Sequence, residues 1–229
     1  MLDAALRRAT GPAFEATGVR LARAGLRPGW LTAAGWLAGV GACVAAGTGT
    51  WGAALALWLA NRLLDGLDGP VARAGQPSER GAFVDIVADF SVYGGFVVGV
   101  AVAEPPARLA CAALLAAYYT SGTAFLALSS LLERQQAESL GDQRSLRFVG
   151  GLAEGGETIA VYVLFCLLPS HATLIAWLFT AAVTVTAAQR VVTGARLLRG
   201  RPGRYGTGTR GASTSLGEPT AAPGGASRR

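Results

Sequence analysis

The sequence predicts an all-α, polytopic membrane protein in which six transmembrane helices follow an interfacial amphipathic helix. Apolar residues make up 52% of the chain and charged residues only 15%, too few charges to cover a soluble protein of this size. Long apolar stretches recur between short polar breaks, and each is near the roughly 20 residues that a helix needs to cross a bilayer. Basic residues collect in alternate breaks, as membrane topology requires.

The N-terminal region, residues 1–28, is predicted to hold a helix over residues 12–25 that lies at the membrane surface. Pro12 suits the first helical position and Gly25 suits the helix end. Basic and apolar residues mix along this segment, as an interfacial helix requires. The alternative is an ordinary cytoplasmic lead-in to the first span. A cleaved signal peptide is not expected, because no apolar core follows Arg7 and Arg8.

The membrane domain is predicted over residues 29–198, followed by a disordered basic tail. Its spans are placed at about 29–48, 51–73, 82–103, 107–132, 150–168 and 172–195. Gly35 and Gly39 give the first span a pattern of small residues that permits close helix approach. Residues 199–229 are rich in Gly, Ser, Thr, Pro and Arg and lack the large apolar residues that folding needs.

The formal net charge is +6, and all 20 basic residues are arginines. Apart from Arg62 and Arg190, which lie inside predicted spans, nearly all fall in breaks on one side of a six-span layout. The opposite breaks carry only Arg108. Both termini are therefore predicted to be cytoplasmic, in a multi-pass protein of the cell membrane. This placement favours contact with anionic lipid headgroups over nucleic acid binding. The three cysteines lie inside apolar segments, and no zinc-type spacing is present.

Four aspartates lie at the predicted cytoplasmic ends of the second and third spans. Asp65 and Asp68 are three residues apart and Asp85 and Asp89 are four apart, so each pair shares a helix face. The connection between the spans is short, which predicts neighbouring antiparallel helices and converging carboxylates. Four carboxylates this close repel one another. A hard divalent cation such as Mg²⁺ resolves the repulsion, because it prefers oxygen ligands and commonly binds carboxylates together with substrate phosphates.

These residues resemble the signature of the CDP-alcohol phosphatidyltransferase family, which runs Asp-x-x-Asp-Gly-x-x-Ala-Arg, a short loop, then Gly-x-x-x-Asp-x-x-x-Asp. The matching positions are Asp65, Asp68, Gly69, Ala72, Arg73, Gly81, Asp85 and Asp89. The resemblance covers about residues 12–198. One departure lies in the loop between Arg73 and Gly81, which holds seven residues where the family usually has eight. A loop is expected to absorb this difference.

The resemblance implies an activity and a site. Asp65, Asp68, Asp85 and Asp89 would bind Mg²⁺ or Mn²⁺, with two ions expected, and Asp89 would also be the candidate base for the acceptor hydroxyl. Gly69, Ala72 and Arg73 would line the pocket for the cytidine diphosphate of the donor. The expected reaction moves a phosphatidyl group from CDP-diacylglycerol to an alcohol acceptor and releases CMP. Similar proteins are homodimers, so a homodimer is expected here.

Two rival functions remain at this stage. The first transfers a CDP-linked headgroup to diacylglycerol, and the second is a cation transporter built on the four aspartates. The acceptor is also open. Glu154 and Glu157 near the start of the fifth span would oppose a phosphorylated acceptor if they faced the cavity, whereas Arg134, Arg144, Arg147 and Arg190 could bind one. The glutamates could equally pair with arginines and never meet substrate.

Overall fold

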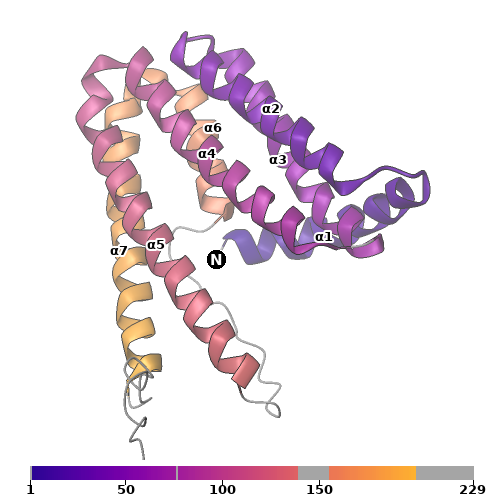
Figure 1. Ribbon diagram of the computed structural model, residues 1–229. Coiled ribbons are helices and arrows are strands. Elements are labelled where there is room, and N and C mark those ends of the chain that lie inside the picture. The colour runs from indigo at the N-terminus through magenta and orange to yellow at the C-terminus, as the bar shows by residue number, and fades with distance from the viewer. Residues whose placement is uncertain (1, 76, 139–154, 200–229) are drawn as a thin grey trace, which may run out of the picture. The chain divides into compact units, whose positions relative to one another are not determined.

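The structure is a computed structural model that describes residues 2–75, 77–138 and 155–199, with no side-chain description for residues 2–9 and 132–138. The described residues up to Leu197 belong to one compact unit. Seven α-helices and two short 3-10 helices occur among the described residues (Figure 1): α1 (Leu2–Arg23), α2 (Pro28–Gly47), α3 (Trp51–Ala74), α4 (Glu79–Ala103), η1 (Pro105–Ala107), α5 (Arg108–Glu138), α6 (Gly155–Leu167), η2 (Pro169–His171) and α7 (Ala172–Leu198).

The first helix differs from the sequence prediction at its start. α1 begins at Leu2, and Pro12 lies inside it rather than at its first position. The alanines, leucines and arginines before Pro12 favour a helix, and they outweigh the backbone hydrogen bond that the proline removes. The predicted end is confirmed. Gly25 has a φ of +85°, and the bonds Gly25 N–H to Ala22 O and Leu26 N–H to Leu21 O close the helix in a Schellman motif.

The starts of the next helices follow from local caps. Pro28 occupies the first turn of α2, where its missing N–H leaves no unpaired group. α4 begins at Glu79, three residues before the predicted span, because the Ser78 side chain accepts a hydrogen bond from the Gly81 N–H at 3.1 Å. The connection between α2 and α3 turns at Gly49, whose φ of +72° favours glycine.

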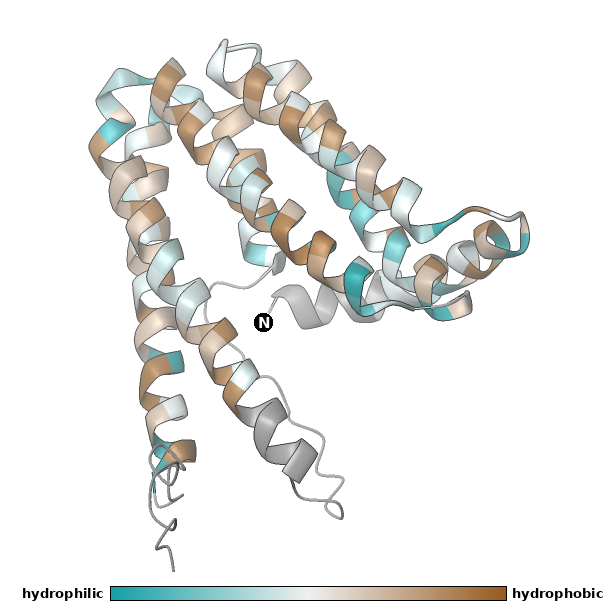
Figure 2. Cartoon of the chain, in the orientation of Figure 1, coloured by the Kyte–Doolittle hydropathy of each residue, from teal (hydrophilic) through white to brown (hydrophobic). Residues whose placement is uncertain are grey.

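The chain is an all-α membrane protein, as predicted. Four segments among the described residues are long and apolar enough to cross a bilayer: Pro28–Gly47, Glu79–Ala103, Pro105–Leu131 and Pro169–Leu198. α3 is also long enough to cross a bilayer, but its charged residues Arg62, Asp65, Asp68 and Arg73 lower its mean hydropathy. The described part of α6 has 13 residues, about 20 Å at 1.5 Å per residue. The count of six spans therefore stays a prediction. Figure 2 shows hydrophobic residues recurring along α4, α5 and α7.

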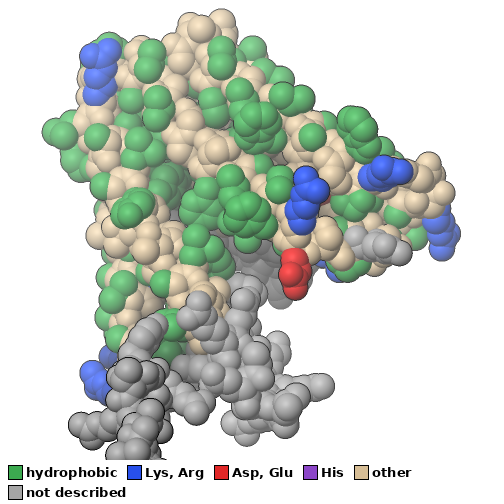
Figure 3. Space-filling model, viewed as in Figure 1, with side chains coloured by type: hydrophobic (Ala, Val, Ile, Leu, Met, Phe, Trp, Pro, Cys, Tyr) green, Lys and Arg blue, Asp and Glu red, His purple; other side chains and the backbone are tan. Residues whose placement is uncertain are grey.

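Hydrophobic side chains recur over the whole described part of the face in Figure 3, between backbone and other side chains, and basic side chains lie toward the helix ends. This is the distribution of a protein whose solvent is the bilayer, with charged groups kept near the headgroups. Many large apolar residues are exposed on the helices, including Leu37, Leu109 and Leu178. Their exposure is ordinary for side chains that face lipid.

Helix α2 packs against both α3 and α4, while α1 lies against α3 and α6. Glycines make these contacts close, as predicted for the first span. A Cβ at Gly39 would lie 2.5 Å from Val92 Cγ2, and one at Gly18 of α1 would overlap Pro70 of α3. Contacts between α3 and α4 use long side chains, such as Trp58 with Phe96. The two helices that carry the aspartates are thus held beside a common neighbour, with room between them.

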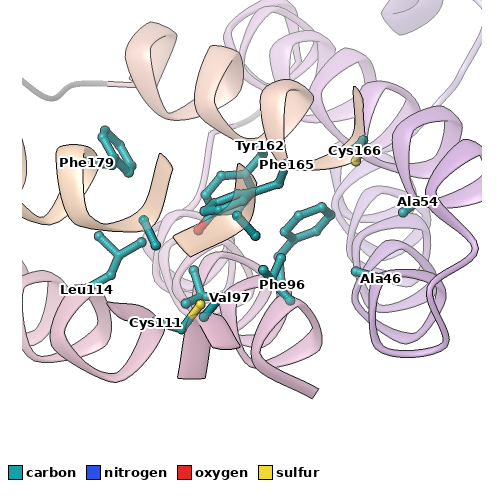
Figure 4. Packing of buried hydrophobic residues seen from close by; sticks show 14 of the residues in the cluster. Ala46, Ala54, Phe96, Val97, Cys111, Leu114, Tyr162, Phe165, Cys166 and Phe179 are labelled. Atoms are coloured by element: carbon teal, nitrogen blue, oxygen red, sulfur yellow. The ribbon is translucent and has the colours of Figure 1, made fainter. Parts of the chain in front are cut away.

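The buried core lies next to this arrangement and is rich in aromatic rings (Figure 4). Tyr162 of α6 stacks on Phe96 of α4 at a centroid distance of 4.7 Å and packs at 4.7 Å against Trp58 of α3. The Tyr162 hydroxyl donates to the Tyr93 carbonyl at 2.8 Å. These rings fix α3, α4 and α6 relative to one another, which makes the polar end of α3 part of a rigid frame.

Candidate functional site

Three of the four aspartates converge between α3 and α4. Asp65 and Asp68 come from α3 and Asp85 from α4, and each offers a carboxylate oxygen within 4.8 Å of the other two. All three side chains are partly buried. Negative charges this close repel one another, and partial burial weakens the screening by water. Oxygen ligands gathered in this way fit a hard divalent cation such as Mg²⁺ or Mn²⁺.

The aspartates line a pocket formed by three helices. Its wall comprises Leu31, Thr32, Gly35 and Trp36 from α2, Asn61, Asp65 and Asp68 from α3, and Asp85, Ala88, Asp89 and Val92 from α4. Its lining combines four carboxylates with apolar side chains such as Leu31, Trp36 and Val92. The carboxylates therefore lie beside apolar side chains in the wall of one pocket.

Two uncharged side chains position this wall. Thr32 Oγ1 of α2 donates to Asp68 Oδ2 at 3.1 Å, which holds that carboxylate toward the pocket. Asn61 is buried, and its Nδ2 donates to the Gly35 carbonyl at 2.8 Å. Both bonds cross between α2 and α3, so the packing of these helices sets the position of the acidic residues. The sequence analysis assigned no role to Thr32 or Asn61.

Arg62 is a further residue that the sequence analysis did not place in the site. Its side chain is only 8% exposed, and it forms ion pairs with Asp89 at 2.8 Å and with Asp65 at 3.3 Å. The sequence did contain a signal for the contact with Asp65. Arg62 lies three residues before Asp65 in an apolar span, and this spacing places both side chains on one helix face.

Asp89 lines the same pocket but is not one of the three aspartates whose carboxylate oxygens lie within 4.8 Å of one another. Its Oδ1 accepts a hydrogen bond from Arg62 Nη2 at 2.8 Å, and 29% of its side chain is exposed. The guanidinium therefore engages one of its two oxygens. The other oxygen can accept a proton or bind an ion, so the geometry accommodates either predicted role.

The residues predicted to bind the donor lie beyond Asp68 on α3. The Arg73 guanidinium lies over Gly69, with its Nη1 3.3 Å from where a Cβ of that residue would be. Arg73 also forms an exposed ion pair with Glu15 of α1. Ala72 is partly buried nearby. The three residues are thus neighbours at the end of α3, next to the acidic pocket and under α1.

The residues considered for the acceptor are described only in part. Arg190 of α7 donates to the Ser121 hydroxyl at 2.8 Å and lies over the Phe125 ring. Glu157 lies in the first turn of α6 and is partly buried. Arg144, Arg147 and Glu154 lie outside the described residues, as does the side chain of Arg134. Nearly all of the predicted tail, residues 199–229, also falls outside them.

Comparison with known proteins identifies the family. The model of the CDP-alcohol phosphatidyltransferase family matches residues 26–188. The chain is 37% identical over 196 residues to the inner membrane protein YnjF of Escherichia coli (strain K12), which covers 85% of this chain and 95% of that protein. The chain therefore belongs to the CDP-alcohol phosphatidyltransferase family and is a multi-pass membrane enzyme.

Solved structures share the fold. A crystal structure of Mycobacterium tuberculosis phosphatidylinositol phosphate synthase (PgsA1) with CDP-DAG bound superposes with a TM-score of 0.62 at 22% identity, covering 80% of this chain and 93% of that one. A second structure of that enzyme, in complex with manganese and citrate, gives a TM-score of 0.60 at 22% identity, covering 79% and 88%. At this identity the likeness concerns the fold.

Proposed function

We propose that this member of the family transfers a phosphatidyl group from CDP-diacylglycerol to an alcohol, releases CMP, and depends on Mg²⁺ or Mn²⁺. The observation that carries the proposal is the convergence of Asp65, Asp68 and Asp85 in one pocket. The diphosphate of such a donor carries the negative charge that a cation held by these carboxylates would bind. The structural neighbour solved with CDP-DAG supports this choice of donor.

Asp65, Asp68 and Asp85 would hold the divalent cations, two in the simplest reading of the resemblance, and Asp89 is close enough to contribute. The three carboxylates supply hard oxygen ligands at suitable separations. When bound, such ions polarise phosphoryl oxygens and stabilise the charge of the leaving group. The neighbour in complex with manganese supports the type of ion.

Asp89 would take the proton of the acceptor hydroxyl. Its Oδ1 accepts a hydrogen bond from Arg62, which orients the carboxylate, and its second oxygen would face the acceptor. A base must lie within hydrogen-bonding distance of the proton that it removes. The acceptor oxygen would then attack the phosphorus on the lipid side of the diphosphate, with CMP as the leaving group.

Gly69, Ala72 and Arg73 would bind the cytidine diphosphate. Small side chains at the first two positions leave room against α3, and the Arg73 guanidinium can neutralise a phosphate charge. Arg73 is exposed and paired only with exposed Glu15 among the ion pairs of the described residues. Exposed pairs contribute little free energy, so a phosphate can displace this one.

The protein would lie in the cell membrane as a homodimer with six spans and both termini in the cytoplasm. Arginine placement supports this orientation. The acidic pocket would then open toward the cytoplasm, where CDP-linked donors and water-soluble acceptors meet.

The test is CMP release by purified protein in detergent, with CDP-diacylglycerol, a panel of alcohols and titrated Mn²⁺. Each of the variants Asp65→Asn, Asp68→Asn and Asp85→Asn should abolish CMP release, because each removes a negatively charged ligand. Glu79→Gln is the matched control. It removes the same negative charge from the first turn of α4, but Glu79 does not line the pocket. Activity within about threefold of the parent in an Asn variant would remove that residue from the site.

The donor panel separates the remaining alternatives. CMP release from CDP-choline or CDP-ethanolamine with diacylglycerol, but not from CDP-diacylglycerol, would reverse the direction of transfer that we propose. Mass spectrometry of the lipid product identifies the acceptor in the same experiment.

A further inference from the structure

We propose that Arg62 is a positioning residue of this site, whose guanidinium orients Asp89 and competes with the divalent ion for the carboxylates of Asp65 and Asp89. The inference rests on the proposed function, because it takes these carboxylates to serve metal binding and proton transfer. It goes further by assigning a role to a basic residue inside an acidic site.

The Arg62 guanidinium is bonded on every side. Nε donates to Asn61 Oδ1 at 2.8 Å, and Nη1 donates to Tyr93 Oη at 2.7 Å and to Asp65 Oδ2 at 3.3 Å. Nη2 donates to Asp89 Oδ1 at 2.8 Å. Because a guanidinium keeps its charge in proteins, a permanent cation occupies this position.

Aromatic rings hold the guanidinium in place from the apolar side. Its central carbon lies 4.8 Å from the Trp58 ring centroid and 5.0 Å from that of Tyr93. Trp58 is fully buried and packs against Tyr162. Cation–π contact in a buried setting adds to the hydrogen bonds. Arg62 thus belongs to the rigid core, and it presents its donors to the pocket at a fixed position.

This placement has two consequences of opposite sign. Arg62 offsets one of the negative charges of the four aspartates, so a divalent ion that approaches Asp65 meets a fixed positive charge. The same cation gives Asp89 a charge-assisted hydrogen bond that sets its orientation. Loss of the charge should therefore strengthen metal binding and weaken catalysis. A residue that only supported the fold would weaken both together.

The conservative replacement separates charge from geometry. Lysine keeps the positive charge but has one nitrogen and no planar fork, so it cannot reach Asp89, Asp65 and Tyr93 together. Arg62→Lys should leave metal affinity near that of the parent and still lower turnover. Tyr93→Phe removes one acceptor of the guanidinium and keeps the ring beneath it, so it should have a smaller effect.

The experiment compares parent, Arg62→Gln, Arg62→Lys, Tyr93→Phe and Asp89→Asn as full-length proteins in detergent. The matched control is Arg108→Gln, because Arg108 is an exposed arginine at the start of α5 whose Nε donates to a backbone carbonyl. Mn²⁺ binding is measured by calorimetry without lipid substrate, and kcat and KM are measured by CMP release. Thermal unfolding without metal shows which variants fold.

Arg62→Gln should bind Mn²⁺ about fivefold more tightly or better, because a competing charge has gone. Its kcat should fall about 10- to 100-fold, the usual effect of losing a partner that orients a site residue. The double variant Arg62→Gln, Asp89→Asn should have a kcat close to that of Asp89→Asn alone, because residue 89 is then no longer the base that Arg62 orients. Tyr93→Phe should lose about threefold in kcat. Arg108→Gln should match the parent.

Equal or weaker Mn²⁺ binding in folded Arg62→Gln would overturn the competition, and an unchanged kcat would overturn the positioning of Asp89. If Arg62→Gln does not fold, the Arg62→Lys and Tyr93→Phe pair decides, and full turnover in both would sink the inference. Failure of the proposed function looks different. A parent that releases no CMP from any CDP-linked donor refutes that function, while the calorimetric comparison still tests the competition.

Discussion

Gly99 of α4 lies where α4 comes closest to α2. A Cβ added there would lie 2.6 Å from the Cys43 carbonyl oxygen, 3.1 Å from the Gly47 nitrogen and 3.1 Å from Ala46 Cβ. Two of these three atoms belong to the α2 backbone and cannot rotate away. Gly99→Ala therefore forces the two helices apart, which disrupts close packing of the kind that small residues permit in membranes.

Gly94→Ala on the same helix is the matched control, because its Cβ would meet nothing within 4 Å. Both substitutions gain up to about 1 kcal/mol of helix propensity. This gain cancels in the comparison, so the difference between the two variants reports the overlap at Gly99. Overpacking of a close-packed interior costs about 1–3 kcal/mol, and we expect Gly99→Ala to be less stable than Gly94→Ala by that amount.

The assay is reversible unfolding in mixed detergent micelles as the fraction of sodium dodecyl sulfate rises, followed by the fluorescence of the five tryptophans. Trp58 reports directly, since it is buried between α3, α4 and α6. Equal free energies of unfolding for the two variants, to within about 0.5 kcal/mol, would show that α2 and α4 do not approach as closely as described.

Three further outcomes are expected. Asp89→Asn should reduce kcat much more than affinity for CDP-diacylglycerol, because a base acts on the acceptor's proton, and a parallel loss of both would make Asp89 a metal ligand only. Deletion of residues 203–229 should leave activity in detergent nearly intact, since this segment lacks apolar residues to pack, and a collapse of activity would contradict that. If Glu157 at the start of α6 faces the acceptor, inositol phosphate and glycerol phosphate should stimulate CMP release little, because its negative charge opposes theirs. Saturable stimulation by either compound would assign the acceptor phosphate to the arginines.

The convergence of Asp65, Asp68 and Asp85 was predictable because each step depends on short-range geometry. Helical periodicity puts residues three or four apart on one face, and the short connection from α3 to α4 returns the chain to the same end. Close approach at Gly39 was predictable for the same reason, since small residues at fixed spacing mark helix contacts. The resemblance to the family then predicted the reaction and the roles of these residues.

The first residues of the helices were harder to predict, because competing local signals determine them. Pro12 favours a helix start, yet the preceding residues extend α1 to Leu2. At α4, the apolar run begins at Ala82, whereas the Ser78 cap adds a polar first turn that hydropathy does not detect. In both places, backbone capping and propensity determined the boundary, and apolar periodicity did not.

The contacts of Arg62 with Asp89 and Tyr93 could not be predicted, because they depend on residues distant in sequence. Its partners Asp89 and Tyr93 lie 27 and 31 positions along the chain, on another helix. An arginine in a span signals function in general terms, but the partner it meets is fixed only by how helices pack. Thr32, 36 positions from Asp68, is a second example.

The geometry of Asp89 follows from the packing of a helix that does not contain it. Gly35 of α2 has no side chain, so Asn61 of α3 can reach its carbonyl at 2.8 Å. Asn61 then presents its Oδ1 to Arg62 Nε at 2.8 Å, and Arg62 bonds Asp89. An added Cβ at Gly35 would lie 3.4 Å from Leu64 Cβ, so a residue with a longer side chain there would push α3 away and disturb each bond in turn. The glycines of α2 therefore serve the site as well as the fold, because they set the distance across which Arg62 must reach.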